Sequence, residues 1–131
     1  MKFFLDNNIS PRISKALREL EGREENEVVH LRERFPADTT DEEWMRRLGD
    51  EGDWIVVTCD TSIAKNPHEI KAWLESGLIV FFLKSGWLNL AFWEFAWQLI
   101  KRWPVMKNKV GKGSRGKGFI VPIRGFVIEE L

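Results

Sequence analysis

Short, uncharged, largely apolar runs separated by amphipathic segments constrain the fold of this chain more than any other feature. Residues 54–59 (WIVVTC) and 78–83 (LIVFFL) carry no charge, and residues 2–5 and 28–31 are shorter runs of similar character. Strands that are apolar throughout belong to parallel sheets, because helices cover both faces of such a sheet. We therefore predict an α/β fold with a mainly parallel central sheet.

Capping residues and apolar spacing locate the helices between these strands. The first helix begins at Ser10-Pro11 and ends at Gly22. Thr40 and Glu43 form a capping-box pattern at the start of a second helix. A third helix follows Asn66-Pro67. The expected inner faces of these three helices are Ile13, Ala16, Leu17 and Leu20, then Trp44, Met45 and Leu48, and then Ile70, Trp73 and Leu74.

A fourth helix, about residues 89–103, is apolar almost all round, so we expect it to be deeply buried or shared with a partner subunit. Its Trp93 and Trp97 lie on adjacent turns and are candidates for the seam of a homodimer. A basic, Gly/Lys-rich loop at 107–118 follows, and a C-terminal strand or hairpin at 119–131 ends the chain.

The length of 131 residues predicts a single domain over 1–131. The single cysteine excludes a disulfide framework and a Cys-based zinc site, so we expect a reducing, cytoplasmic location. Asp6 comes too early for the apolar core of a signal peptide. No run of about 18 apolar residues is present, so we expect no membrane association.

A net charge of zero conceals two blocks of opposite sign. Residues 21–53 contain 12 acidic and 5 basic residues, and residues 101–118 contain 7 basic residues and no acid. Such blocks indicate two separate tasks, or one task that needs both signs, such as a cation site beside an anion-binding arm. Mutual neutralisation without a functional role is the alternative.

Acidic residues follow the predicted strands at the edge where ligands bind in open α/β sheets. Asp6 follows the first strand, Asp60 follows the third, and Asp41 lies in the first turn of the helix between them. Carboxylates brought together in this way need a cation or a shared proton, and their oxygens suit Mg²⁺ or Mn²⁺. A divalent ion held there polarises a phosphoryl oxygen and activates water.

Each acid taken alone also has a structural explanation. Asp60 has the place of a helix N-cap, Asp41 favours a helix dipole, and Asp6-Asn7-Asn8 is ordinary turn chemistry. An interaction protein whose carboxylates only cap helices is therefore one alternative. The conjunction of all three positions in this order is what favours a metal site.

Four segments together resemble the PIN-like superfamily, most closely its compact VapC-toxin-like branch. They are FLDNNISP at 4–11, VVHL at 28–31, TDEE at 40–43 and IVVTCD at 55–60. The resemblance spans about residues 2–100. It implies a three-layer α/β/α sandwich and a Mg²⁺- or Mn²⁺-dependent endoribonuclease. Such a hydrolase is typically the toxin of a toxin–antitoxin pair, with RNA as substrate and a small antitoxin protein as partner.

By position, the resemblance assigns Asp6, Asp41 and Asp60 as catalytic residues and metal ligands. Glu42 or Glu43 is an alternative to Asp41, because a shift of one residue rotates a helical side chain by roughly 100°. Many relatives carry a second acid where this chain has Ser62, which offers at best a weak or water-mediated ligand. The position after Asp6 is Asn7, without charge, so three carboxylates favour one metal ion over two.

Cations in the basic loop are candidates for contacts with the RNA backbone, although a solvated loop between strands explains them equally well. No aromatic residue lies within 107–117 to stack on bases. His30, inside a strand, is expected to be packed rather than catalytic. A catalytically weak PIN-like module that binds RNA or a protein partner is the second hypothesis. The candidate RNA-binding cations are Lys107, Lys109, Lys112, Arg115 and Lys117.

Other doubly wound families do not fit. The chain has no glycine-rich dinucleotide fingerprint after the first strand and no P-loop. A receiver domain needs a second acid at the position of Asn7.

Overall fold

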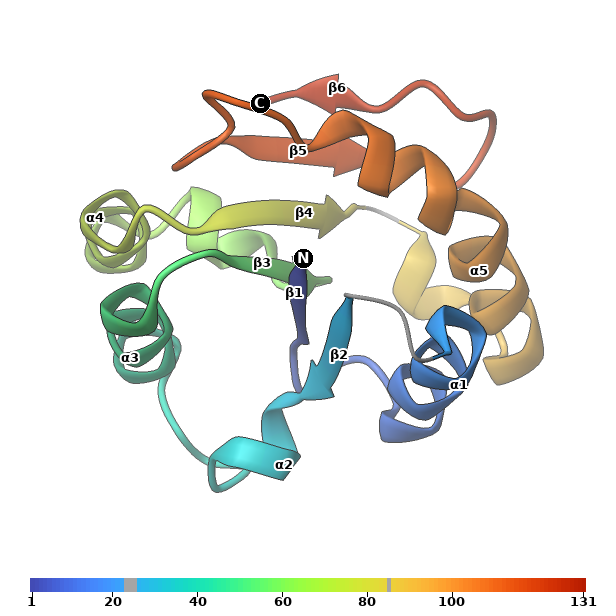
Figure 1. The fold of residues 1–131 in the computed structure, drawn as a ribbon, viewed down its shortest axis with the longest axis horizontal. Helices are drawn as coiled ribbons and strands as arrows, with labels where there is room; N and C mark the ends of the chain where they lie inside the picture. Colours follow the sequence, from blue (N-terminus) through green and yellow to red (C-terminus); the bar gives the residue numbers. More distant parts are fainter. Residues whose placement is uncertain (23–25, 85) are drawn as a thin grey trace.

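A computed structural model describes residues 1–22, 26–84 and 86–131, so residues 23–25 of the acidic block lie outside the described residues. Its strands form one sheet in the order β2-β1-β3-β4-β5-β6 (Figure 1). The first five are mutually parallel, and β6 pairs antiparallel with β5. The strands are β1 Lys2–Leu5, β2 Glu27–His30, β3 Trp54–Thr58, β4 Ile79–Leu83, β5 Gly118–Val121 and β6 Glu129–Glu130.

Helices cover both faces of this sheet, which confirms the three-layer α/β/α sandwich (Figure 1). The α-helices are α1 Pro11–Glu21, α2 Leu31–Arg34, α3 Asp41–Glu51, α4 Pro67–Ser76 and α5 Phe92–Lys109. Two short 3₁₀ helices, η1 Thr61–Ala64 and η2 Trp87–Asn89, follow β3 and β4. Helices α1 and α5 pack on one face, and α2, α3 and α4 pack on the other.

Successive side chains of a strand point to opposite faces of the sheet, so each strand contributes to the hydrophobic core on both faces. On β1, Phe3 faces α5 and its ring lies 4.6 Å from that of Trp103, centroid to centroid. The next residue, Phe4, faces the opposite layer and lies 5.0 Å from the ring of Trp44 on α3. Because Phe3 and Phe4 pack against opposite layers, β1 is buried on both faces, as its apolar run predicts.

The predicted helix starts are confirmed by their caps. The Ser10 hydroxyl accepts a hydrogen bond from the Arg12 backbone N–H at 3.2 Å, and the Asn66 side chain accepts one from His68 at 3.1 Å. Thr40 accepts one from the Glu43 N–H at 3.2 Å. These bonds satisfy donors that a helix start otherwise leaves free.

Element boundaries differ from the predictions at two places. Strand β2 ends at His30, because Leu31 already begins α2. Helix α5 starts at Phe92 and continues past Pro104 to Lys109, since residues beyond the proline, such as Met106, still bury on its inner face. The basic loop therefore begins at residue 110 and not at 107.

Several predicted inner faces are also corrected. Ala16, Leu20 and Leu74 are exposed, and serines take inner positions on the same helices. Ser14 on α1 and Ser76 on α4 remain buried because each hydroxyl donates to a carbonyl three residues earlier, at 2.7 and 2.6 Å. A hydrogen bond within the helix thus replaces apolar packing at these points.

Helix α5 is buried on one side only. Leu99 is fully buried, whereas Trp93 is 82% exposed and Trp97 is 56% exposed. The prediction that α5 is deeply buried is therefore wrong, and its outer side carries an unusual amount of exposed aromatic surface. No helix in the described part of the chain is both long enough and apolar enough to span a bilayer.

Candidate metal centre

Asp6 follows β1 and is held in place from two sides. Its Oδ2 accepts a hydrogen bond from the Thr58 hydroxyl at 2.7 Å, and its Oδ1 accepts one from the Asn7 N–H at 2.6 Å. Thr58 ends β3, the parallel neighbour of β1, so the sheet itself brings the two residues together. Asp6 is only 4% exposed, and this burial raises its pKa even though both hydrogen bonds favour the carboxylate.

Asp60 follows β3 and caps the 3₁₀ helix η1. Its Oδ1 accepts hydrogen bonds from the Ser62 N–H at 2.9 Å and from the Ser62 hydroxyl at 2.6 Å. Burial opposes ionisation here too, but the hydrogen bonds from Ser62 and Asp41 outweigh it and lower the pKa of Asp60. Both the capping role and the place in the acidic cluster therefore apply to the same side chain.

Asp41 is the first residue of α3 and faces the other two acids. Its Oδ1 accepts a hydrogen bond from the indole N–H of Trp44 at 3.0 Å. Burial, contacts with the carboxyls of Glu69 and Asp60, and the charge of Asp6 together raise the pKa of Asp41 to about 8. The raised pKa favours the protonated form of this carboxyl, and binding of a cation would displace the proton.

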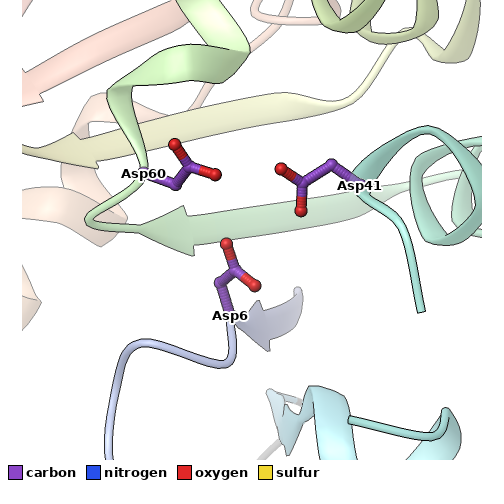
Figure 2. Close-up of side chains that lie close together, drawn as sticks. All are labelled: Asp6, Asp41 and Asp60. Atoms are coloured by element: carbon purple, nitrogen blue, oxygen red, sulfur yellow. The ribbon is translucent and has the colours of Figure 1, made fainter. Parts of the chain in front are cut away.

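The three aspartates point toward a common centre from three separate segments (Figure 2). One carboxylate oxygen from each lies within 4.8 Å of the others. Oxygens bound to one octahedral Mg²⁺ ion lie about 3 to 4.2 Å apart, so binding of the ion would draw the three carboxylates closer together. The donors are hard, negatively charged oxygens, and the residues present therefore fit a divalent ion of this class.

The other predicted ligands point elsewhere. Glu42 and Glu43 are exposed and line a groove of about 830 Å³ between α3 and α4. The Ser62 hydroxyl donates a hydrogen bond to Asp60 and thereby orients that carboxylate. Among Asp41, Glu42 and Glu43, the helix therefore turns only Asp41 toward Asp6.

Glu69, in the first turn of α4, is an acid beside the cluster that sequence reasoning missed. Its carboxyl lies near that of Asp41 and contributes to the raised pKa of Asp41. The sequence does offer a signal for Glu69, because it lies in the first turn of the helix that follows Asp60. The position of an acid in a first helical turn also identified Asp41. Glu69 was missed because nothing in the sequence places the start of α4 beside the start of α3.

The basic loop lies at the edge of the sheet opposite the aspartates. The loop precedes β5, and Gly116 N–H donates to the Gly77 carbonyl, just before β4, at 3.0 Å. The aspartates lie at the carboxyl ends of parallel strands, whereas this loop lies at their amino ends. A strand of five residues such as β3 spans roughly 16 Å, so the two charged regions are separated by the length of the sheet. The prediction that the cation site lies directly beside the basic loop is therefore wrong.

Three of the five cations predicted to bind RNA also have partners within the protein. Lys107, on α5, lies 2.8 Å from the carboxylate of Glu21, which is 7% exposed. Lys117 pairs with Glu130 at 3.0 Å. The guanidinium of Arg115 covers Gly77, where an added Cβ would lie only 2.4 Å from it. Lys109 and Lys112 are exposed.

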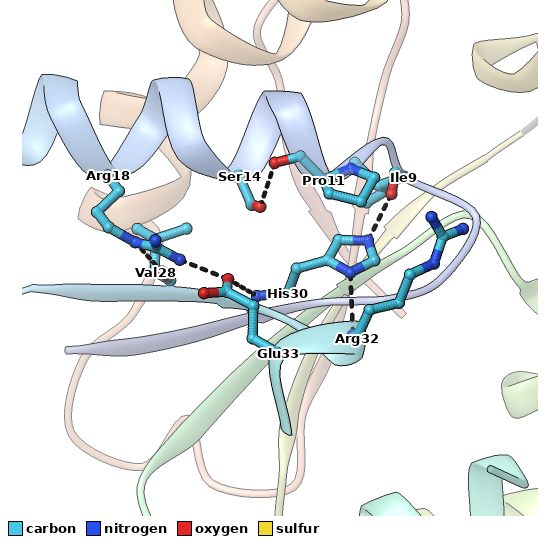
Figure 3. Close-up of polar contacts among 8 residues, drawn as sticks. All are labelled: Ile9, Pro11, Ser14, Arg18, Val28, His30, Arg32 and Glu33. Carbon is cyan, nitrogen blue, oxygen red and sulfur yellow. Dashed lines mark hydrogen bonds and ion pairs between the residues drawn. The ribbon is translucent and has the colours of Figure 1, made fainter. Parts of the chain in front are cut away.

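His30 is packed, as expected, and supports the turn after Asp6 (Figure 3). Its Nε2 lies 2.6 Å from the Ile9 carbonyl, and its Nδ1 accepts a hydrogen bond from the Arg32 N–H at 3.1 Å. Burial lowers the pKa of His30. The Arg32 guanidinium is exposed on the same edge as the aspartates, and its Nε donates to Oδ1 of Asn7 at 2.6 Å.

Residues 1–85 match the family model of the PIN like domain. The matched segment contains β1 to β4 and all three aspartates of the cluster, whereas α5, β5 and β6 lie beyond it. Comparisons with curated proteins and with solved structures found no match.

Proposed function

Because this chain belongs to the PIN-like domain family, we propose that it is a metal-dependent endoribonuclease that hydrolyses phosphodiester bonds in RNA. The observation that carries this proposal is the convergence of Asp6, Asp41 and Asp60 to within 4.8 Å. Three acids from three segments would not remain together without a cation or protons to offset their repulsion. Family membership and geometry thus support the same chemistry.

The three aspartates have different parts in this proposal. Asp6 and Asp60 are oriented by hydrogen bonds from Thr58 and Ser62, so they form the preorganised side of the centre. Asp41 completes it by exchanging its proton for the cation. Mg²⁺ or Mn²⁺ bound there would neutralise charge on the scissile phosphate and supply an activated water.

Substrate contacts on the aspartate edge fall to Arg32. Its exposed guanidinium is held by Asn7, the neighbour of Asp6, and a planar guanidinium suits phosphate oxygens. Lys109 and Lys112, at the opposite edge, would contact a longer RNA strand away from the site of cleavage. Lys107 and Lys117 have weaker support in this role because carboxylates already neutralise them.

The decisive experiment compares the wild type with Asp6→Asn and Asp60→Asn. We expect Mn²⁺ to raise the melting temperature of the wild type, and both variants to lose this rise together with RNA cleavage. Asp50→Asn, an exposed acid on α3, is the matched control and keeps both properties. Cleavage that survives in folded Asp6→Asn would overturn the assignment.

A catalytically weak module that binds RNA or a protein is the second candidate. It is favoured by the uncharged Asn7 and by Ser62, whose hydroxyl is committed to Asp60. Salt-dependent RNA binding without Mn²⁺-dependent turnover would distinguish it from the nuclease.

For the biological setting we propose a cytoplasmic toxin whose partner is a small antitoxin. The exposed indoles of Trp93 and Trp97 on α5 are the surface for this partner, or for a second copy in a homodimer. Light scattering of the wild type and of a Trp93→Ser/Trp97→Ser variant separates these two occupants. A dimeric wild type and a monomeric variant would identify the homodimer.

A further inference from the structure

The outer side of α5 carries a stripe of exposed side chains that begins at the aspartate edge. Trp93 lies in the first turn of this helix, and Trp97 lies one turn later on the same side. Helices α1 and α5 cover the same face of the sheet (Figure 1). Their starts lie together, because the Arg12 guanidinium is 3.9 Å from the ring centre of Phe92. Helix α1 begins where β1 and the turn after Asp6 end, so the stripe starts on the edge that holds the metal centre.

Cations accompany the exposed rings of this stripe. The Lys101 ammonium lies 5.3 Å from the ring centre of Trp97 and 5.7 Å from that of Phe126, within the range of cation–π contacts. Phe126 is exposed and belongs to the C-terminal segment. The buried Arg102 holds this segment against α5, because its Nε donates to the Gly125 carbonyl at 3.1 Å. Helix α5 and the C-terminal segment therefore form one surface of aromatic rings and positive charge.

The other end of the stripe reaches the basic loop. Helix α5 ends at Lys109, and Lys112 follows in the loop, both with exposed side chains. The helix rises by roughly 24 Å from Trp93 to Lys109, so its outer side connects the two edges of the sheet. Glu94 is the only acid within α5. A polyanion that leaves the aspartate edge along this helix thus meets little repulsion before it reaches the exposed lysines.

These properties match a single strand of RNA better than a protein partner. Single-stranded nucleic acids bind where bases stack on aromatic rings and cations follow the phosphates. The cores of protein interfaces are depleted of charge, whereas the Lys101 ammonium contacts two of the rings here. Helix α5 also lies beyond residues 1–85, so this surface does not follow from the family match.

We propose that the outer side of α5, together with Phe126, binds unpaired bases of the RNA along a path from the metal centre to the basic loop. This inference rests on the proposed function, in which the aspartates cleave the same strand. Trp93 and Trp97 stack on bases, and Lys101 and Lys109 contact phosphates. Because the surface includes the two indoles proposed for a protein partner, such a partner would compete with the RNA.

The test is binding of a labelled RNA of about 12 nucleotides, measured by fluorescence anisotropy in EDTA so that no cleavage occurs. Trp93→Ser/Trp97→Ser should weaken binding at least about tenfold, because each lost stacking contact lowers the affinity severalfold. The wild type should bind this RNA less tightly once a complementary strand pairs its bases. Leu74→Ser, which replaces an exposed apolar side chain on α4, is the matched control and should bind as the wild type does.

A second variant, Lys101→Gln, keeps both indoles and should lower the slope of log affinity against log salt concentration by about 0.7. Equal affinities of the wild type and folded Trp93→Ser/Trp97→Ser would overturn the inference. A change in oligomeric state with unchanged RNA affinity would also overturn it and would assign the indoles to a protein alone. The rise in melting temperature with Mn²⁺ tests the metal centre separately, because neither variant alters an aspartate. Loss of that rise in the wild type is therefore distinct from failure of the RNA surface.

Discussion

The contact between Glu21 and α5 allows a quantitative prediction about stability. Glu21 ends α1, where a negative charge is unfavourable to the helix dipole, yet its carboxylate is 7% exposed. It accepts hydrogen bonds from the Trp103 indole at 2.8 Å, from the Lys107 ammonium at 2.8 Å and from Asn26 at 3.0 Å. We predict that Glu21→Gln unfolds more easily, because the Lys107 charge then has no partner.

The expected loss is about 3 kcal/mol, the lower end for breaking a buried ion pair, since the Lys107 side chain is 29% exposed. The entropy of unfolding for 131 residues is about 0.28 kcal/mol/K at 2.1 cal/mol/K per residue. The melting temperature should therefore fall by about 11 °C, as measured by circular dichroism. Glu19→Gln, an exposed neighbour on α1, serves as the control and should change the melting temperature little.

The same variant has a defined pH dependence. Burial opposes ionisation of Glu21, but hydrogen bonds from Lys107, Asn26 and Trp103 prevail and lower its pKa from the ordinary value of 4.5. A lowered pKa in the folded state adds stability above pH 4.5, and this stability disappears as the pH falls through the folded value. The difference between wild type and Glu21→Gln should be constant near pH 7 and shrink below pH 4.5. An equal difference at pH 3 and pH 7, or a loss below about 3 °C, would refute the reasoning.

Two further predictions concern helix packing and RNA contacts. Gly49→Ala should destabilise the protein by about 1–2 kcal/mol in urea unfolding, because its Cβ meets Ser76, whereas Gly111→Ala, in open space, should change stability by less than about 0.5 kcal/mol. Arg32→Gln should weaken binding of a short RNA and lower the slope of log affinity against log salt concentration by about 0.7. It should not alter the rise in melting temperature that Mn²⁺ produces. Lys112→Gln should leave short-RNA binding unchanged, and an effect equal to that of Arg32→Gln would contradict the assignment of RNA contacts to the aspartate edge.

The sequence was sufficient to predict the parallel sheet and the three aspartates at its carboxyl edge, because both depend on local patterns. Apolar runs such as 54–58 indicate strands buried on both faces, and the carboxyl-edge rule then places Asp6 and Asp60 together without knowledge of packing. Asp41 required one more inference, namely that the helix capped by Thr40 begins at the same edge of the sheet. Each of these inferences uses residues close in the chain.

The remaining features depend on contacts between elements far apart in the chain. The basic loop was expected to accompany the metal site, but its edge is set by the parallel pairing of β5 with β4, which no local pattern near 107–118 encodes. Glu69 was missed because its position depends on how α4 packs against α3 at Gly49. The ion pair of Lys107 likewise links residues 86 positions apart.

The short strand β6 limits how this edge of the sheet can associate with other chains. That outer strand is two residues long, both are acidic, and Lys117 binds one of them. Short, charged border strands discourage pairing with a strand from another molecule, so growth of the sheet across molecules is disfavoured at this border. Recognition there is thus left to side chains on the helices, and the outer side of α5 presents the aromatic groups for it.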